Sequence, residues 1–224
     1  VASNFFPAMT ALKPELEQNC GIDVSLTSGA SSVLYQQIVM SAPFDLFLSA
    51  DESLPELLSQ SNTQIPYHIP FQYAQGELVF YAPNHVFKSA DITQIQSFSR
   101  IVKANGKTAP YGRAAAQVLS SMAYNGQLIT ANNVAQSFQF IDSGAVVAGF
   151  VAKSLLPVEV TEQVFIPLSL SLYDPILQFG ILVSGHGKGS CVANFLQQTS
   201  TQNSLNKFGY ITKSATDNST EATK

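Results

Sequence analysis

Apolar residues in this chain recur with helical spacing in some segments and with strand-like spacing in others. Within residues 6–19, Ala8, Leu12 and Leu16 recur at the spacing of one helix face. Pro7 suits the first helical turn, where a missing N–H group removes no intrahelical bond. The pattern therefore predicts a helix over residues 6–19.

The same spacing predicts the remaining elements. Further helices are expected over residues 32–40, 52–60, 114–126, 132–144 and 190–207, with a short one inside 92–104. Strands are expected over residues 22–28, 45–49, 76–83, 145–154, 162–169 and 175–184, with a loop over 62–75. Strands that alternate with helices indicate an α/β fold. These elements are too many for one small sheet, so two lobes are expected.

The expected lobes divide the chain at three places. Residues 1–83 form the first part of lobe I, residues 84–174 form lobe II, and residues 175–213 return to lobe I with the final helix. The polar residues 214–224 are expected to be a disordered tail.

Composition and charge exclude several classes of protein. Apolar residues make up 46% of the chain and charged residues only 12%, so Ser, Thr, Asn and Gln must cover much of the surface. The formal net charge of −4 argues against a nucleic-acid partner, which requires clustered Lys and Arg. No apolar run approaches the roughly 18 residues of a membrane span.

Two features bear on the compartment. No signal peptide is visible, and the abrupt opening at Val1 is interpreted as a processed or trimmed N-terminus. Cys20 and Cys191 do not have the spacing of metal ligands. They are either buried free thiols or one disulfide, and a disulfide would be compatible with an oxidising compartment.

Turns of small residues stand directly before several predicted helices. They lie at residues 2–4, 29–31 and 109–112, and residues 132–134 repeat the pattern. The first N–H groups of a helix have no intrahelical partner and carry partial positive charge, so they can bind an anion without any lysine. Each turn alone is better explained as an N-cap. Several of them in a two-lobed α/β chain favour one shared ligand site, because loops at strand ends converge.

Two of these segments carry a family resemblance. SGASSVLYQQI (28–38) and SAPFDLFLSADE (41–52) resemble the periplasmic molybdate-binding proteins of ABC transporters. The opening ASNFFPAM, APYGRAAAQVL (109–119) and the closing NKFGYI fit the same family in order, so the resemblance spans almost the whole chain. It implies a type II periplasmic binding protein, with two α/β lobes and a ligand cleft between them.

The resemblance also implies a set of oxyanion-binding residues. Carried over by position, they are Ser3, Asn4, Ser31, Tyr111 and Val134. Ser3 and Ser31 would use their hydroxyls, whereas Tyr111 and Val134 would use only their backbone N–H groups. Some members add a tyrosine hydroxyl at a position that is Ala152 here, and Asn4 is expected to compensate for it.

The implied function is capture of molybdate or tungstate for uptake by an ABC transporter permease. The protein is expected to be a periplasmic or lipid-anchored monomer that has no cofactor, no metal ion bound directly by side chains and no catalytic residue. A receptor for another tetrahedral oxyanion, such as sulfate or phosphate, is the alternative within the same class. An enzyme with Ser31 as nucleophile is less favoured, since no G-x-S-x-G frame surrounds that serine. An effector domain of a regulator would share the fold, but no DNA-binding segment is visible.

Other candidate chemistry is weaker. GHGKGS (185–190) fails the phosphate-loop pattern and is expected to be a turn. The three histidines are scattered without metal-ligand spacing. Arg113 is expected to be solvated or paired with a carboxylate, and Asp51 is expected to cap the helix that follows it.

Overall fold

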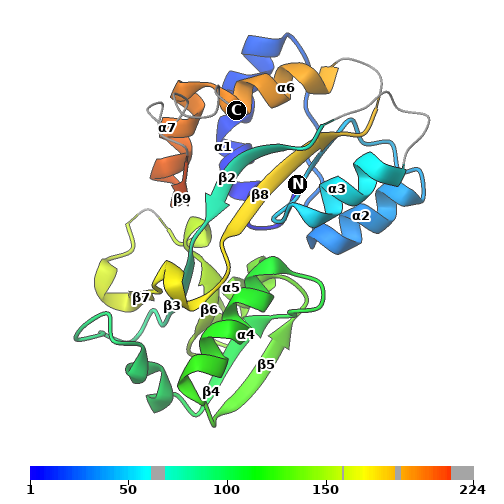
Figure 1. Cartoon of the computed structure of the whole chain (residues 1–224). Coiled ribbons are helices and arrows are strands. Elements are labelled where there is room, and N and C mark those ends of the chain that lie inside the picture. The colour runs from blue at the N-terminus through cyan, green and yellow to red at the C-terminus, as the bar shows by residue number, and fades with distance from the viewer. Residues whose placement is uncertain (62–68, 158, 185–187, 213–224) are drawn as a thin grey trace, which may run out of the picture.

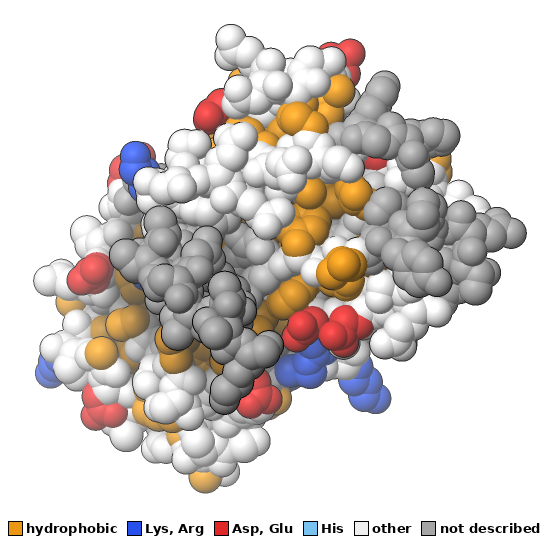
Figure 2. Space-filling view, turned by 45° about the horizontal axis from the view of Figure 1, so that its top comes forward, with side chains coloured by type: hydrophobic (Ala, Val, Ile, Leu, Met, Phe, Trp, Pro, Cys, Tyr) orange, Lys and Arg blue, Asp and Glu red, His pale blue; other side chains and the backbone are white. Residues whose placement is uncertain are grey.

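The computed structural model describes residues 1–61, 69–157, 159–184 and 188–212. The predicted tail at 214–224 and the first half of the predicted turn at 185–190 lie outside these residues, as does the first half of the predicted loop at 62–75. The described chain forms two sheets, each flanked by helices (Figure 1). On the face seen in Figure 2, charged side chains are sparse, in keeping with their low share of the composition.

The first sheet has four strands, in the order β1-β8-β2-β9, and all neighbours are antiparallel. Its strands are β1 (Leu46–Leu48), β2 (Phe71–Gly76), β8 (Ile176–Leu182) and β9 (Tyr210–Ile211). Around it lie α1 (Phe6–Cys20), α2 (Ser31–Val39), α3 (Ser53–Ser61), α6 (Lys188–Gln197) and α7 (Thr199–Lys207). Helices α1, α6 and α7 lie on one side of this sheet, and α2 and α3 lie on the other (Figure 1).

The second sheet has five strands, in the order β5-β4-β6-β3-β7. Its strands are β3 (Leu78–Tyr81), β4 (Arg100–Ala104), β5 (Gln127–Ala131), β6 (Gly149–Ala152) and β7 (Phe165–Pro167). Strand β4 is parallel to β5 and β6, whereas β3 is antiparallel to β6 and β7. Short 3-10 helices lie at η1 (Ile92–Ser97), η2 (Lys153–Leu155), η3 (Glu162–Val164) and η4 (Leu170–Leu172).

Helices α4 (Pro110–Met122) and α5 (Val134–Asp142) cover opposite faces of the second sheet. Leu78 and Phe80 share one buried cluster with α4 residues, while Val79 and Tyr81 share another with Ile141 of α5. Alternate residues of a strand point to opposite faces, so β3 contributes to both clusters. This explains why its four residues are all buried.

The chain crosses between the sheets twice. Only Glu77 separates β2 from β3, and the return passes from η4 through Tyr173 into β8. The Leu78 N–H donates to the Tyr173 hydroxyl (3.1 Å), which ties the two crossings together. The predicted strand over 76–83 is confirmed as β3, although its first residue, Gly76, belongs to β2 in the other sheet. We define the first lobe as residues 1–77 and 175–212 and the second lobe as residues 78–174.

Several other predicted elements differ in the structure. The short helix predicted inside 92–104 is present as η1, but β4 follows it within the same range. Strand β5 lies where no element was predicted, and most of β2 lies in the predicted loop. Strand β5 is a largely exposed edge strand without a clear apolar signal, and in β4 the apolar pair Ile101-Val102 is flanked by the charged residues Arg100 and Lys103. The predicted final helix is two helices, α6 and α7, because Gln198 between them has an extended backbone.

The predicted strand over 22–28 does not form. The Thr27 carbonyl accepts from the N-terminal amino group of Val1 (2.7 Å), and the adjoining Gly29 forms an isolated bridge with Ala2. A groove of about 450 Å³, lined in part by Val24, Leu26 and Phe47, lies beside them. Because a strand requires a partner for its backbone groups, this segment stays irregular among the described residues.

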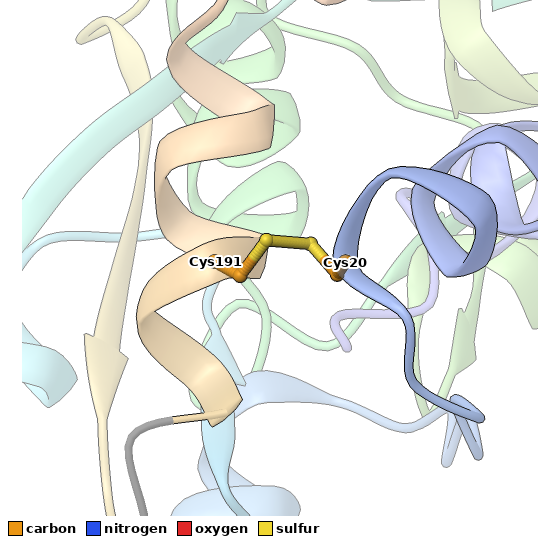
Figure 3. Close-up of a disulfide and its surroundings, with 2 residues drawn as sticks. All are labelled: Cys20 and Cys191. Carbon is orange, nitrogen blue, oxygen red and sulfur yellow. A yellow bond between two sulfur atoms is a disulfide. The ribbon is translucent and has the colours of Figure 1, made fainter.

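Cys20 and Cys191 form a disulfide, which decides between the two alternatives left open by the sequence (Figure 3). Their Cα atoms are 5.9 Å apart. The bond joins the last residue of α1 to α6, so it lies wholly within the first lobe. In the described part of the chain, no helix has both the length and the apolar character to cross a membrane.

Candidate functional site

In the first lobe, the segments that precede α1, α2 and α3 lie side by side. The Ala2 N–H donates to the Leu48 carbonyl (2.8 Å), and the Ser3 N–H donates to the Gly29 carbonyl (2.9 Å). The Ser31 hydroxyl oxygen accepts from the Ala50 N–H (3.0 Å). These bonds place the predicted residues Ser3 and Ser31 side by side, and both are buried.

The second lobe contributes two further helix starts. Helix α4 begins after Ala109, and α5 begins after Asn133, whose side chain accepts from the Gln136 N–H (2.9 Å). The Thr108 hydroxyl donates to the Asn132 carbonyl (3.4 Å), which joins the two turns. The predicted residues Tyr111 and Val134 are buried in the first turns of these helices.

The turns before α1 and α2 in the first lobe face the turns before α4 and α5 in the second lobe. The Ser32 hydroxyl donates to the Thr108 carbonyl (3.1 Å), which connects the start of α2 to the turn before α4. Ala2 and Ala50 of the first lobe share one buried cluster with Ala109, Tyr111 and Val134 of the second. The structure thus gathers the segments that carry all five predicted residues at one place between the lobes.

Several donors at this place have no partner among the described residues. The backbone N–H groups of Asn4, Ser31, Tyr111 and Val134 donate to no described atom, and neither does the hydroxyl of Ser3. Unpaired buried N–H groups are rare in folded proteins, because each loses its water without a replacement. A cluster of such donors from both lobes is suited to an acceptor-only ligand.

Charged side chains at the rim are already paired. Arg113 Nη2 lies 3.2 Å from Asp51 Oδ2, so the predicted pairing of Arg113 is confirmed. Asp51 Oδ1 also accepts from the Leu54 N–H (3.3 Å), which confirms its predicted role at the start of α3. The pair connects α4 of the second lobe with the first lobe. The positive charge of Arg113 is balanced by Asp51, so it is not an unpaired charge that would hold a ligand.

A buried polar cluster lies behind the site, and sequence reasoning missed most of it. We call it the hub; its members are Asn4, Tyr73, Tyr111, Gln178 and Tyr210. Asn4 Nδ2 lies within 3.3 Å of the Tyr111 hydroxyl, 3.1 Å of Gln178 Oε1 and 3.2 Å of the Tyr210 hydroxyl. The Asn4 side-chain N–H groups are thus directed at the hub, and its backbone N–H remains the donor available to a ligand.

The members of the hub are hydrogen-bonded to one another, and their phenols are shielded from water. Gln178 Nε2 donates to the Tyr111 hydroxyl (3.1 Å), and the Tyr73 hydroxyl donates to Gln178 Oε1 (3.0 Å). Desolvation raises the pKa of the Tyr73, Tyr111 and Tyr210 phenols, so all three remain neutral at physiological pH. The signal in the sequence was a single Gln within the apolar run PILQFGIL, since a buried polar residue requires partners.

The remaining candidates that the structure describes contribute no ligand group, while His68 and His186 lie outside the described residues. Ala152 is buried in β6, opposite Leu78, and carries no hydroxyl. The His85 ring packs against the rings of Phe87 and Phe98, with centroids 4.7 and 5.2 Å away. The described residues contain no group of three or more His, Cys, Asp or Glu side chains placed to hold a metal ion.

Comparisons with known proteins show the family to which this chain is similar. Residues 1–211 match the family model described as bacterial extracellular solute-binding protein. The molybdate-binding protein ModA of Azotobacter vinelandii is 35% identical over 160 residues, which span 69% of this chain and 63% of that protein. ModA of Rhodobacter capsulatus is 29% identical over 229 residues, covering 95% of this chain and 87% of that protein.

A solved structure is also similar. The periplasmic molybdate-binding protein of Azotobacter vinelandii superposes with a TM-score of 0.84 at 27% identity. The match covers 95% of this chain and 97% of that chain. The two-lobed α/β arrangement is therefore shared over nearly the full length of both.

Proposed function

This chain belongs to the bacterial extracellular solute-binding proteins, and on that basis we propose that it captures molybdate or tungstate for uptake by an ABC transporter. The observation that carries the proposal is the set of unpaired donors gathered from both lobes. We assign the oxyanion to the hydroxyls and backbone N–H groups of Ser3, Asn4, Ser31, Tyr111 and Val134, with Asn4 acting through its backbone. The relatives that carry the name molybdate-binding protein support this choice of anion.

The chemistry of the donors suits a tetrahedral dianion. Molybdate and tungstate present only acceptor oxygens, whereas a protonated oxyanion would direct a donor at a donor. Partial positive charge at the starts of α2, α4 and α5 attracts an anion without a cationic side chain. The net charge of −4 is therefore no obstacle to anion binding.

The number of donors also sets the expected strength of binding. Hydrogen bonds to a charged group contribute roughly 1.5–3 kcal/mol each. Five to seven such bonds, less the cost of desolvation and of closing the lobes, leave about −8 to −12 kcal/mol. This corresponds to a dissociation constant between roughly micromolar and nanomolar.

The proposal also covers the compartment, the partners and the oligomeric state of the protein. We place the protein outside the cytoplasmic membrane, in the periplasm or on a lipid anchor, and the disulfide supports an oxidising compartment. The lobes would deliver the anion to a permease in the membrane. We propose a monomer that binds no nucleic acid and carries no cofactor. We assign no catalytic residue, because the Ser31 hydroxyl oxygen accepts from a backbone N–H and has no histidine base among its partners in the described part of the chain.

Calorimetry with four anions tests the proposal. The protein should bind molybdate and tungstate with one site per chain, and more tightly than sulfate and phosphate. Binding of sulfate or phosphate without molybdate would replace the proposed ligand with the alternative oxyanion. Binding of none of the four would remove the assignment of the site altogether.

A further inference from the structure

The hub links the two halves of the candidate site through side chains that lie behind it. Tyr111 belongs to α4 of the second lobe, whereas Asn4 and Gln178 belong to the first lobe. The Tyr111 hydroxyl accepts from Asn4 Nδ2 (3.3 Å) and from Gln178 Nε2 (3.1 Å). Both hydrogen bonds therefore cross from one lobe to the other in a fully buried setting.

In both Asn4 and Tyr111, the backbone N–H lies in the candidate site and the side chain lies in the hub. Their backbone N–H groups are among the unpaired donors, while their side chains contact each other. Asn4 is held further by its carbonyl, which accepts from the Tyr210 hydroxyl (2.8 Å) and the Ser154 hydroxyl (3.2 Å). A displacement of either side chain would therefore shift a donor in the site.

The hub also lies against the crossing of the chain between the lobes. Gly76 is the last residue of β2, and a Cβ atom on it would overlap the Tyr111 hydroxyl. The same Cβ would meet Gln178 Nε2 at 2.9 Å. The phenol thus fills the space beside the strand about which the lobes would move relative to each other.

We propose that the Tyr111 hydroxyl, held by Asn4 Nδ2 and Gln178 Nε2, is a positioning group that locks the second-lobe donors opposite the first-lobe donors. It sets the affinity for the oxyanion through the closed arrangement of the lobes, without touching the anion. This inference rests on the proposed function. It assigns the phenol of Tyr111 a role in binding, whereas the family resemblance implied a role only for the backbone N–H.

The physical reason is that two buried donors, on Asn4 and Gln178, would lose the Tyr111 hydroxyl as an acceptor. Without the hydroxyl, Gln178 Nε2 loses its acceptor, and Asn4 Nδ2 retains only Gln178 Oε1 and the Tyr210 hydroxyl. Buried donors without an acceptor are costly, but they can recover water if the lobes separate. Loss of the hydroxyl should therefore favour the open arrangement and speed the release of the anion.

The variant Tyr111→Phe tests this directly, because it removes one oxygen and keeps the ring and the backbone N–H. We expect the dissociation constant for molybdate to rise about tenfold. The increase should come mainly from a faster dissociation rate in stopped-flow measurements, with one site per chain retained. An unchanged dissociation constant would overturn the inference.

Two tyrosines provide matched controls. The Tyr73 hydroxyl also belongs to the hub, but it donates to Gln178 Oε1 and the Ser49 carbonyl, both within the first lobe. The Tyr124 hydroxyl donates to the Phe98 carbonyl inside the second lobe. Tyr124→Phe should leave affinity unchanged, and Tyr73→Phe should raise the dissociation constant by less than about threefold. Equal losses for Tyr73→Phe and Tyr111→Phe would show that the hub only supports the fold, and the inference would fail.

A ligand-free measurement keeps this inference separate from the proposed function. Spin labels at the exposed positions Met40 and Val147 report the distance between the lobes. Tyr111→Phe should broaden this distribution toward longer distances without any anion, and Tyr73→Phe should not. If the wild type bound no molybdate but this shift occurred, the proposed function would fail and the positioning role would stand. If molybdate bound but neither the distribution nor the affinity changed in Tyr111→Phe, only the positioning role would fail.

Discussion

At the scale of single residues, Ser31 combines a structural and a binding role in one hydroxyl. Its oxygen accepts from the Ala50 N–H (3.0 Å), which fixes the orientation of the side chain. A hydroxyl has one hydrogen to donate as well, and that hydrogen remains available to a ligand. The contact with Ala50 therefore orients the donor toward the place where the turns meet.

Ser31→Ala should weaken molybdate binding at least about tenfold, since a hydrogen bond to a charged group contributes roughly 1.5–3 kcal/mol. Titration calorimetry measures the change. The control is Ser120→Ala, because the Ser120 hydroxyl on the exposed face of α4 donates only to the Ala116 carbonyl (2.8 Å). An affinity equal to that of the control would contradict the role assigned to Ser31.

The buried phenols predict how stability depends on alkaline pH. Burial raises the pKa of Tyr73, Tyr111 and Tyr210 above the unfolded value of about 10. The folded chain therefore holds these protons more tightly than the unfolded chain. Their contribution to stability is complete below about pH 10 and is lost as the pH rises toward the folded-state pKa values.

Denaturant unfolding between neutral pH and pH 11 checks this dependence. The free energy of unfolding should fall above about pH 10, by up to about 1.4 kcal/mol per pH unit for each such phenol. Tyr210→Phe should make the fall shallower, because it removes one of the three groups. A wild-type curve that stays flat through this range would show that these phenols are not held neutral by the fold.

The identities of the candidate site residues followed from family resemblance, and their grouping was then visible in the structure. The hub was not predicted, because its members are separated by up to 206 positions, as between Asn4 and Tyr210. Only Gln178 gave a local signal, since it interrupts an apolar strand. The direction of the Asn4 side chain depends on these distant partners, so no pattern near Asn4 could show it.

At the scale of elements, helices with a clear apolar face and five of the described strands were predicted, whereas β2, β4, β5 and β9 were not. Helix α1 matches its prediction to within one residue, and α2 begins one residue earlier than expected. Strand β5 failed because only its last residue is buried, so its sequence lacks the alternation of a half-buried strand. The strand predicted over 76–83 formed as β3, but no local pattern showed that Gly76 ends a strand of the other sheet.

The start of α5 provides a prediction at this scale. The Asn133 side chain accepts from the Gln136 N–H (2.9 Å), which holds the first turn that presents the Val134 N–H. Asn133→Ala should reduce the free energy of unfolding by about 1 kcal/mol. It should also weaken molybdate binding severalfold, because the unpaired donor loses its fixed direction.

A second cap serves as the control for α5. The Asp91 side chain accepts from the Thr93 N–H (2.9 Å) at the start of η1, which is remote from the site residues. Asp91→Ala should reduce stability without changing the affinity for molybdate. Thermal unfolding and calorimetry on both variants give the comparison. Equal affinities for the two variants would sink the proposed link between this cap and the site.

At the scale of the whole molecule, the lobes differ in how the chain builds them. The second lobe is one continuous stretch, whereas the first lobe consists of two stretches that the disulfide joins across 171 positions. A cross-link over so long a loop restricts the unfolded chain strongly and stabilises by about 2–5 kcal/mol. The bond joins α1 to α6, on the side of the first sheet away from α2 and α3.

Removal of the disulfide should therefore separate stability from binding. The double variant Cys20→Ser, Cys191→Ser should unfold about 2–5 kcal/mol more easily than the oxidised protein. At low temperature it should still bind molybdate with an affinity within about threefold of the wild type, because no donor of the site touches the bond. The wild type under a reducing agent should match the variant. A loss of binding in the folded variant would mean that the bond also shapes the cleft.

The long separation between Cys20 and Cys191 has a consequence for biogenesis. A chain that emerges from its amino end exposes Cys20 early, and its partner follows only after the whole second lobe has appeared. The lone thiol must therefore pass through most of synthesis without reacting elsewhere. The bond therefore cannot close before α6, which carries Cys191, has been synthesised.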